Sequence, residues 1–359
     1  MSRPLKTYVD LEAIKHNYLV SKSLHPHSHS FAVVKANAYG HGARKVASYL
    51  DEYVDAFAVA SIDEAIELRE ALVTSPIFLL EGTFSKDELY QCQEYRFWTV
   101  IENTIQLNDF INNDVSIEKI FIKIDTGMHR LGISPDNVDS FVNSLQATGR
   151  VEEVLLMTHF SSADNLQSQV TSEQQACFAK ACENVSHLIT SVANSAAVLK
   201  EKLPDKSWLR PGLMLYGISP FEGISASELD LKPAMTFMSK VISVRKLKEG
   251  EKVGYAQAYE VKGDKVIATV AVGYGDGYPR GLDFTTPIII HGEVCFLAGR
   301  VSMDMITVDV SHLEAVEIGD DVLLWGANNP VETVAAHVQT IGYELVTRMT
   351  GRAKIEYIG

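Results

Sequence analysis

A lysine directly after an apolar segment is the residue in this sequence best placed for chemistry. Residues 31–34 (FAVV) form a short apolar run rich in β-branched side chains, which is typical of a strand buried on both faces. Lys35 follows this run, and a turn containing Gly40, His41 and Gly42 comes next. Desolvation at the mouth of a buried strand lowers the pKa of an amine and makes it a nucleophile or base. Taken alone, a lysine at a strand end more often extends its amine into solvent.

Polar residues follow the later apolar runs in the same way. Each of these residues could instead have a structural role: His159 could be a hydrogen-bonded histidine of the core, and Arg210 could belong to a surface ion pair. It is their joint occurrence at successive strand ends that predicts a site. They are Tyr39 after the first run, Lys123, Asp125, His129 and Arg130 in and after the fifth, His159 at the end of the sixth, Asn194 and Ser195 after the seventh, and Arg210 and Gly212 at the eighth.

The elements that would position these residues alternate between strand and helix. Amphipathic stretches separate the apolar runs, and one of them, 60–72, begins with Asp63 and Glu64, which favour a helix N-terminus. Eight strand–helix units predict an N-terminal (β/α)8 TIM barrel over residues 1–230, with its site at the carboxyl ends of the strands. A doubly wound open sheet is the alternative, but the glycine fingerprint usual after its first strand is missing. The expected strands are 31–35, 56–61, 77–82, 97–101, 120–125, 154–160, 188–194 and 209–217.

The pattern changes after residue 230. Strand-like segments separated by Gly, Pro and Asp turns replace the helices until residues 330–349. Residues 231–359 are therefore predicted to be a C-terminal, mainly-β domain, and the whole chain an α/β protein.

The composition limits the class of protein. The chain has 359 residues, of which 46% are hydrophobic and 22% charged, as in an ordinary globular protein with a large core. A net charge of −14 argues against nucleic acid or an anionic membrane as a partner. The first residues lack an apolar signal core, and the four cysteines lack a paired spacing, so a cytoplasmic location is expected. No metal site is expected, since His25, His27 and His29 are best explained as a solvated loop.

The residue types at the later strand ends favour a phosphate ligand. Ser195 opens a helical segment, and Gly212 with Leu213 forms a turn whose backbone N–H groups can approach a ligand closely. A phosphate site beside a strand-end lysine indicates pyridoxal phosphate, held as a Schiff base by Lys35.

Eight segments, in their order along the chain, resemble the motifs of the alanine racemase family. The resemblance extends over essentially the whole chain. It implies a pyridoxal-phosphate-dependent isomerase of fold type III that interconverts L- and D-alanine, and a homodimer whose sites are completed in trans. The segments are AVVKANAYGHG, KIDTGMHRLG, THFSSAD, ANSAA, LRPGLMLYG, VGYAQAY, VGYGDGYPRG and GRVSMDM.

The resemblance implies two acid/base groups on opposite faces of the substrate. Lys35 would hold the cofactor and act on one face of the α-carbon, while Tyr255 of the partner subunit would act on the other. A tyrosine with an ordinary pKa of ~10 is a poor base, so His159 and Arg210 would tune it. Arg210 would also face the pyridine nitrogen, and because a guanidinium keeps its proton, that nitrogen would stay unprotonated.

The remaining roles are implied by the same resemblance. Arg130 would bind the phenolic oxygen of the cofactor and the substrate carboxylate. Lys123 matches a carbamylated lysine of the family; the alternative is an unmodified lysine paired with an acid such as Asp125. The other cofactor contacts would be Tyr39, His159, Asn194, Ser195, Arg210, Gly212 and Leu213. The substrate contacts would be Tyr274, Met303 and Asp304, and a gate on the access path would consist of Asp164, Arg280 and Arg300.

Two positions depart from the family pattern. Gly351 stands where many members carry a tyrosine that contacts the phosphate and the catalytic tyrosine. Phosphate binding or the packing of Tyr255 is therefore expected to be looser here. Ser302 stands where some members carry a cysteine, which removes an oxidisable thiol near the site.

The substrate pocket and the domain plan leave alternatives open. Two tyrosines in the pocket favour a methyl side chain, but serine or broad-specificity racemisation stays open. A basic-amino-acid decarboxylase shares the domain plan, although VGYAQAY and GRVSMDM fit a racemase better, and a cofactor-carrier protein would lack the β domain. The sequence does not distinguish D-alanine supply for peptidoglycan from catabolism of L-alanine.

Overall fold

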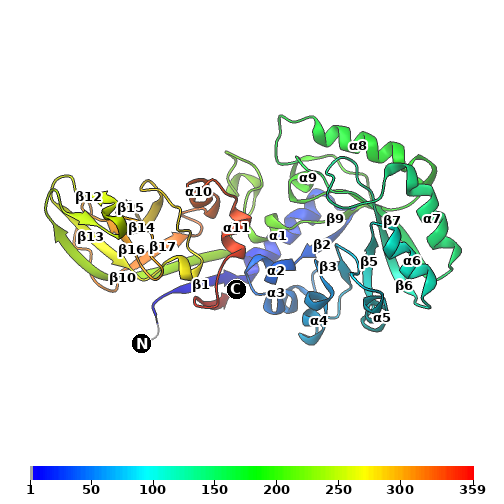
Figure 1. Ribbon diagram of the computed structural model, residues 1–359, viewed down its shortest axis with the longest axis horizontal. Helices are drawn as coiled ribbons and strands as arrows, with labels where there is room; N and C mark the ends of the chain where they lie inside the picture. Colours follow the sequence, from blue (N-terminus) through cyan, green and yellow to red (C-terminus); the bar gives the residue numbers. More distant parts are fainter. Residues whose placement is uncertain (1–2) are drawn as a thin grey trace. The chain divides into compact units, whose positions relative to one another are not determined.

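The computed structural model describes residues 3–359, and these form two compact units (Figure 1). The barrel unit comprises residues 15–215 and 219–231. The β unit comprises the described residues up to Ile14 together with 216–218 and 232–359.

The barrel unit is built on eight parallel strands in the order β8-β7-β6-β5-β4-β3-β2-β9. The outermost two are joined by hydrogen bonds from Ser191 Oγ to the Trp208 carbonyl (2.7 Å) and from the Arg210 N–H to the Ala193 carbonyl (3.0 Å), so the sheet nearly closes. The predicted barrel is thereby confirmed. The strands are β2 (His29–Val33), β3 (Ala56–Val59), β4 (Ile77–Leu79), β5 (Phe97–Ile101), β6 (Ile117–Lys123), β7 (Val151–Met157), β8 (Thr190–Ser191) and β9 (Trp208–Leu209).

The last two barrel strands are shorter than the sequence predicts. Strands are predicted over 188–194 and 209–217, but β8 and β9 contain two residues each. Pro211 has no N–H for a sheet ladder, and the chain then enters a 3-10 turn, η3 (Leu213–Tyr216).

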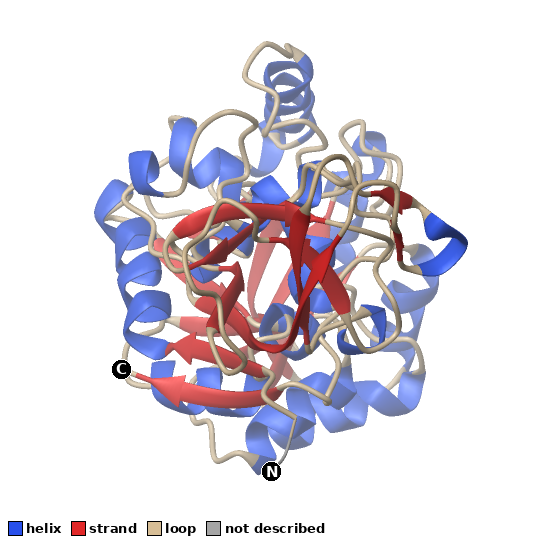
Figure 2. Ribbon diagram, turned by 90° about the vertical axis from the view of Figure 1, so that its left-hand side faces the viewer, coloured by secondary structure: helices blue, strands red, loops and turns tan. Residues whose placement is uncertain are grey.

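Helices lie outside the barrel strands, as the blue elements of Figure 2 show. Side-chain caps begin several of them; for example, Ser61 Oγ accepts the Glu64 N–H and Asn103 Oδ1 accepts the Gln106 N–H. The helices are α1 (Leu11–Leu24), α2 (Lys35–Tyr39), α3 (Ala43–Leu50), α4 (Ile62–Glu70), α5 (Lys86–Tyr95), α6 (Thr104–Asn112), α7 (Val138–Ala147), α8 (Val170–Ala181) and α9 (Ser195–Lys200). Short 3-10 turns are η1 (Pro135–Asn137), η2 (Glu183–Val185) and η4 (Ser227–Leu229).

The interior of the barrel strands is filled with aromatic side chains. Phe78 and Phe121 have ring centroids 4.4 Å apart, and Phe31 lies 4.5 Å from Trp208 and 6.4 Å from Trp98. All five side chains are buried. This packing fixes the strands whose other ends carry the polar residues of interest.

The β unit is an eight-stranded sheet in the order β13-β16-β15-β14-β17-β10-β1-β18, with an additional pairing between β13 and β10. β1 pairs antiparallel with β10 and parallel with β18, so the first strand of the chain belongs to this sheet although it lies in the range 1–230. The strands are β1 (Lys6–Asp10), β10 (Met235–Leu247), β13 (Lys265–Val270), β14 (Pro287–Ile290), β15 (Glu293–Leu297), β16 (Ile306–Asp309), β17 (Asp321–Trp325) and β18 (Lys354–Ile358). A separate pair is β11 (Lys252–Val253) with β12 (Tyr259–Glu260); the helical elements are η5 (Tyr255–Gln257), η6 (Tyr274–Asp276), α10 (Val331–Ala336) and α11 (Gly342–Thr347).

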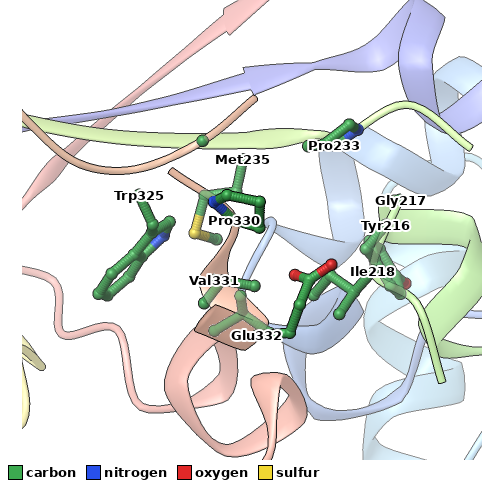
Figure 3. Close-up of a pocket in the computed structure, with 11 residues that line it drawn as sticks. Tyr216, Gly217, Ile218, Pro233, Met235, Trp325, Pro330, Val331 and Glu332 are labelled. Carbon is green, nitrogen blue, oxygen red and sulfur yellow. The ribbon is translucent and has the colours of Figure 1, made fainter. Parts of the chain in front are cut away.

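A small hollow lies inside the β unit, between its sheet and α10 (Figure 3). Trp325, Met235, Pro330 and Val331 are among the residues around it, and its volume is about 10 Å³. That volume is close to the minimum for one water molecule, so the hollow is not a substrate site.

None of the helices in residues 3–359 combines the length and the apolar character needed to cross a lipid bilayer.

Candidate active site

The predicted site residues of the barrel unit lie at the carboxyl ends of its strands. Lys35 follows β2 after one intervening residue, Lys123 is the last residue of β6, and His159 lies two residues beyond β7. Arg210 comes directly after β9. The positive charges of the two lysines, Arg210 and Arg130 all act on His159, so the barrel brings these groups together as predicted from its topology.

The segment after Lys35 is a turn of left-handed helical backbone. Such backbone costs an L-residue about 1–2 kcal/mol, so a run of it needs support from its surroundings. Nothing in the sequence pattern predicted this turn. Four successive residues have φ angles between 50° and 55°: Ala36, Asn37, Ala38 and Tyr39.

Hydroxyl and backbone N–H groups converge at the ends of β8 and β9. A Cβ atom added to Gly212 would lie 2.6 Å from Tyr39 Oη and 3.9 Å from Ser195 Oγ, so these groups adjoin. Ser195 Oγ accepts the N–H of Gly212 at 2.9 Å, and Asn194 caps α9 by accepting the Ala197 N–H at 3.1 Å. Glycine is required here because a side chain would fill the space between the two hydroxyl groups, which we call the cradle. Hydroxyl groups can donate to a phosphate oxygen, so the cradle fits a phosphate group.

Arg210 is buried and its terminal nitrogens are fully engaged. Nη1 donates to the carbonyl and hydroxyl of Ser191, both at 2.6 Å. Nη2 donates to the Thr158 carbonyl (2.5 Å), the Val192 carbonyl (3.3 Å) and His159 Nδ1 (3.3 Å). Five acceptors thus use both hydrogens of each nitrogen, and among the described residues the Nε–H is the donor left for a ligand.

The contact with Arg210 also fixes the tautomer of His159. A guanidinium has no acceptor atom, so Nδ1 must accept in this contact and the ring proton lies on Nε2. Burial and then the charges of Arg210, Arg130, Lys123 and Lys35 hold the pKa of His159 well below its ordinary value. His159 is therefore a neutral imidazole at neutral pH, with its ring proton on Nε2.

Lys123 is a buried amine in this cationic group. Burial, followed by the charges of Arg210 and Arg130, lowers its pKa from 10.5 to about 8, against the opposing effect of Glu102 and Glu81. Asp125 instead binds His129 Nδ1 at 2.9 Å. Residues 3–359 thus contain no ion pair between Lys123 and Asp125, which was the alternative to a modified lysine.

The predicted residues of the β unit lie on exposed turns. Tyr255 begins η5 with 71% of its surface exposed. The backbone on both sides of it is left-handed, with φ angles of 75° at Gly254, 59° at Ala256 and 52° at Gln257.

Tyr274 and Met303 are held side by side by their backbones. The Tyr274 N–H donates to the Ser302 carbonyl at 3.0 Å, and the Gly275 N–H donates to the Met303 carbonyl at 2.9 Å. A Cβ at Gly273 would lie 2.3 Å from the Met303 carbonyl oxygen, so this close approach depends on glycine. The side chains of Tyr274 and Met303 remain 40% and 53% exposed.

A network of ion pairs that the sequence did not predict supports these two turns. Asp276 is fully buried; it accepts the Gly273 N–H (2.8 Å) and Arg3 Nη2 (2.6 Å) and lies 3.3 Å from Arg352 Nε. Asp304 accepts Arg352 Nη2 at 2.6 Å. The carboxylate of Asp304, predicted as a substrate contact, is therefore occupied by an arginine of the same unit.

The predicted gate residues are all exposed. Asp164 lies in the barrel unit, whereas Arg280 and Arg300 lie in the β unit. Gly351 is also exposed, and a Cβ added to it would meet no atom within 4 Å.

Comparisons with known proteins agree with this arrangement. Residues 9–220 match the family "Alanine racemase, N-terminal domain", and residues 234–357 match "Alanine racemase, C-terminal domain". A curated relative from Pseudoalteromonas atlantica, "Alanine racemase", is 44% identical over 374 residues, which cover all of both chains. Another from Pseudomonas aeruginosa, "Alanine racemase, biosynthetic", is 42% identical over 356 residues and 99% of both chains.

Solved structures give the same result. The crystal structure of the biosynthetic alanine racemase from Pseudomonas aeruginosa matches with a TM-score of 0.95 at 42% identity, covering 99% of this chain and 100% of that one. The alanine racemase of Acinetobacter baumannii matches with a TM-score of 0.95 at 35% identity and the same coverage.

Proposed function

This chain belongs to the alanine racemase family, and from that premise we propose that it interconverts L- and D-alanine with pyridoxal phosphate as its cofactor. The observation that carries the proposal is the convergence of Lys35, His159 and Arg210 at the carboxyl ends of the barrel strands. The fold that carries these residues matches that of alanine racemases, and a bound amino acid would contact them.

The residues at the strand ends would hold the cofactor between them. Lys35 would bind its aldehyde carbon, Arg210 would donate its Nε–H to the pyridine nitrogen, and Arg130 would bind the phenolic oxygen. The phosphate contacts would be Tyr39, Asn194, Ser195, Gly212 and Leu213, with His159 beside the ring. When bound, the cofactor supplies an electron-withdrawing system that makes the α-proton of alanine acidic.

The protein's own residues would then move the proton. The Lys35 amine serves one face of the α-carbon, and the phenolic oxygen of Tyr255 serves the other. His159, neutral and protonated on Nε2, would donate to that oxygen and stabilise negative charge on it. Arg210 keeps its charge among five acceptors and orients His159.

A homodimer is part of the proposal, with Tyr255, Tyr274, Met303 and Asp304 supplied by the partner subunit. Its support is the exposure of Tyr255, since a catalytic phenol at 71% exposure needs another surface to exclude water from it. Asp164, Arg280 and Arg300 would then line the path by which substrate reaches the site.

A cytoplasmic location and a biosynthetic role complete the proposal. All four cysteines are free in the structure, which fits a reducing compartment. The Pseudomonas aeruginosa relative is named as biosynthetic, which favours supply of D-alanine for peptidoglycan.

Lys123 is proposed to carry a carbamate. Its amine is buried, its pKa is lowered to about 8, and neighbouring Arg130 would pair with the negative charge that the modification adds. A larger fraction of neutral amine favours the reaction with carbon dioxide, in which the N–C bond forms and the proton goes to solvent.

The test is exchange of the α-proton with deuterium oxide for L-alanine, D-alanine, L-serine and L-lysine. Wild type should exchange and invert alanine, whereas Tyr255→Phe should lose exchange from the L-isomer alone, by about 10²–10⁴-fold. Tyr90→Phe, which removes an exposed hydroxyl on α5, is the matched control and should behave as wild type.

Other outcomes would overturn parts of the proposal. Exchange or carbon dioxide release with lysine but not alanine would indicate a decarboxylase on this scaffold. Equal inversion of serine and alanine would replace strict alanine specificity with a broader one.

A further inference from the structure

The left-handed turn at residues 36–39 links the two ends of the proposed cofactor site. Lys35 lies directly before it, and Tyr39, the last residue of the turn, reaches the cradle at Gly212. The relative positions of the lysine amine and the tyrosine hydroxyl therefore depend on this backbone remaining left-handed. L-residues disfavour that conformation sterically, so it persists only where neighbouring groups hold it.

Several hydrogen bonds hold the turn from within its own segment. Asn37 accepts the Ala43 N–H through Oδ1 (2.8 Å) and the Gly42 N–H through its carbonyl (2.9 Å). His41 Nδ1 lies 2.9 Å from the Tyr39 carbonyl. The Gly40 N–H also donates to the Ala36 carbonyl at 3.1 Å. These contacts hold the exit of the turn toward α3, but none of them binds the N–H of Ala36, its first residue.

The first amide of the turn is bound from another part of the barrel. Glu64, in the first turn of α4, accepts the Ala36 N–H through Oε1 at 2.7 Å and the Ala60 N–H through Oε2 at 2.8 Å. Ala60 directly follows β3, so the carboxylate ties the end of β3 to the residue after Lys35. Hydrogen bonds to an ionised carboxylate are stronger than those between neutral groups.

Glu64 differs in its contacts from the neighbouring acid of α4. Ser61 caps the helix by accepting the Glu64 N–H, which sets the helix start and the direction of the carboxylate. Asp63, the neighbouring acid of the same turn, is exposed. Both acids stand near the helix N-terminus, but only Glu64 holds Ala36.

We propose that Glu64 is a positioning residue that keeps residues 36–39 left-handed and so sets Lys35 and Tyr39 at the spacing the cofactor requires. Glu64 does not touch cofactor or substrate in this inference, which rests on the proposed function only for the roles of Lys35 and Tyr39. The proposal thus adds to the site Glu64, which lies on α4, the helix that follows strand β3.

Glu64→Gln is the sharpest change. The amide keeps one acceptor oxygen but presents an NH₂ group to the second backbone N–H, so one of the two bonds is lost with little change in volume. We expect hydrogen exchange of the 35–42 segment to quicken about tenfold and the cofactor to dissociate about tenfold faster during dialysis. Asp63→Asn is the matched control and should change neither.

Glycine at position 36 supplies a rescue experiment. Ala36 is exposed, so Ala36→Gly leaves no cavity, and glycine adopts left-handed backbone without the steric cost. Adding Ala36→Gly to Glu64→Gln should restore most of the cofactor retention. A general loss of structure would not be repaired by this change.

The readouts separate the two proposals. Faster exchange of 35–42 in Glu64→Gln with unchanged cofactor retention would overturn the positioning role and leave the racemase assignment intact. Unchanged exchange, or no rescue by Ala36→Gly, would also overturn it. If Glu64→Gln does not fold, Glu64→Asp, whose shorter side chain cannot bridge both amides, takes its place with the same expectations.

Discussion

Lys35 and Tyr255 both lie beside left-handed backbone, but their surroundings differ. The turn after Lys35 is bonded to Glu64 from α4 and to α3 through Asn37. The turn of Tyr255 is closed by a hydrogen bond from the Gln257 N–H to the Gly254 carbonyl at 3.1 Å, and its phenol is mostly exposed.

The two halves of the proposed site also differ in charge. The barrel half is a group of cations in which Arg210 and Lys123 are both buried. The β half is balanced, with Arg3 and Arg352 against Asp276 and Asp304. An unbalanced cationic group suits a phosphate and a carboxylate, whereas a balanced network suits loops that must keep their shape. The barrel unit therefore supplies the charge for binding, and the β unit supplies support for the positions of its loops.

The largest expected effect tests the buried charge of Lys123, which Glu102 and Glu81 compensate only in part. Its pKa is about 8 in the folded chain and 10.5 unfolded, so between these pH values the folded state binds fewer protons and stability rises with pH. Lys123→Met removes this dependence. The experiment uses CO₂-free buffer so that Lys123 stays unmodified. From pH 7.5 to pH 10.5, the free energy of unfolding of the wild type should rise by on the order of 3 kcal/mol relative to that of the variant.

Chemical denaturation at the two pH values measures this difference. Lys86→Met, which removes an exposed lysine at the start of α5, should show no such change. A constant difference between wild type and Lys123→Met would mean that Lys123 is not a partly compensated buried cation.

A smaller effect tests the balance of the β half. Arg3→Met leaves Arg352 as the one cation paired with the buried carboxylate of Asp276 among the described residues, which should cost about 2 kcal/mol of stability. Because Asp276 and Arg3 support the turns of Tyr274 and Met303, KM for alanine should rise more than kcat falls. Denaturation and steady-state kinetics measure the two effects.

Lys6→Met is the control for this experiment. Lys6 pairs with Glu356 on the surface of the same unit, where solvent screens the two charges, so the loss of this pair should cost much less stability than the loss of Arg3. Equal losses in the two variants would contradict a special role for the Asp276 network.

The smallest effect concerns Gly351. A tyrosine there meets open space, so Gly351→Tyr should change stability by no more than about 0.5 kcal/mol. If its hydroxyl reaches the phosphate, cofactor dissociation should slow by about 2–10-fold, corresponding to one hydrogen bond. Gly351→Phe lacks the hydroxyl and should leave the dissociation rate unchanged; an equal slowing in both variants would assign the effect to packing.

The barrel and the strand ends were predictable because they depend on local patterns. Apolar runs mark buried strands, and the fold then requires that residues such as Lys35, His159 and Arg210 meet at one end. The predicted fold class and the resemblance to alanine racemases are both confirmed. The roles of individual site residues remain predictions.

The features that were missed depend on long-range contacts. The left-handed turn includes two alanines, which give no local sign of positive φ, and its support comes from Glu64 on another helix. Arg3 lies 273 positions from Asp276, so no spacing rule connects them. Arg352 follows Gly351, a position compared with the family pattern. Its partners, Asp276 and Asp304, are distant in the sequence and come close to it only in the folded β unit.

The three tryptophans give the two units separate optical signals. Trp98 and Trp208 lie in the barrel unit with ring centroids 5.4 Å apart, whereas Trp325 is the indole of the β unit and is fully buried near Tyr278. Fluorescence from Trp325 therefore reports the opening of one unit by itself. The emission spectrum of this chain can show whether its halves unfold together or in sequence.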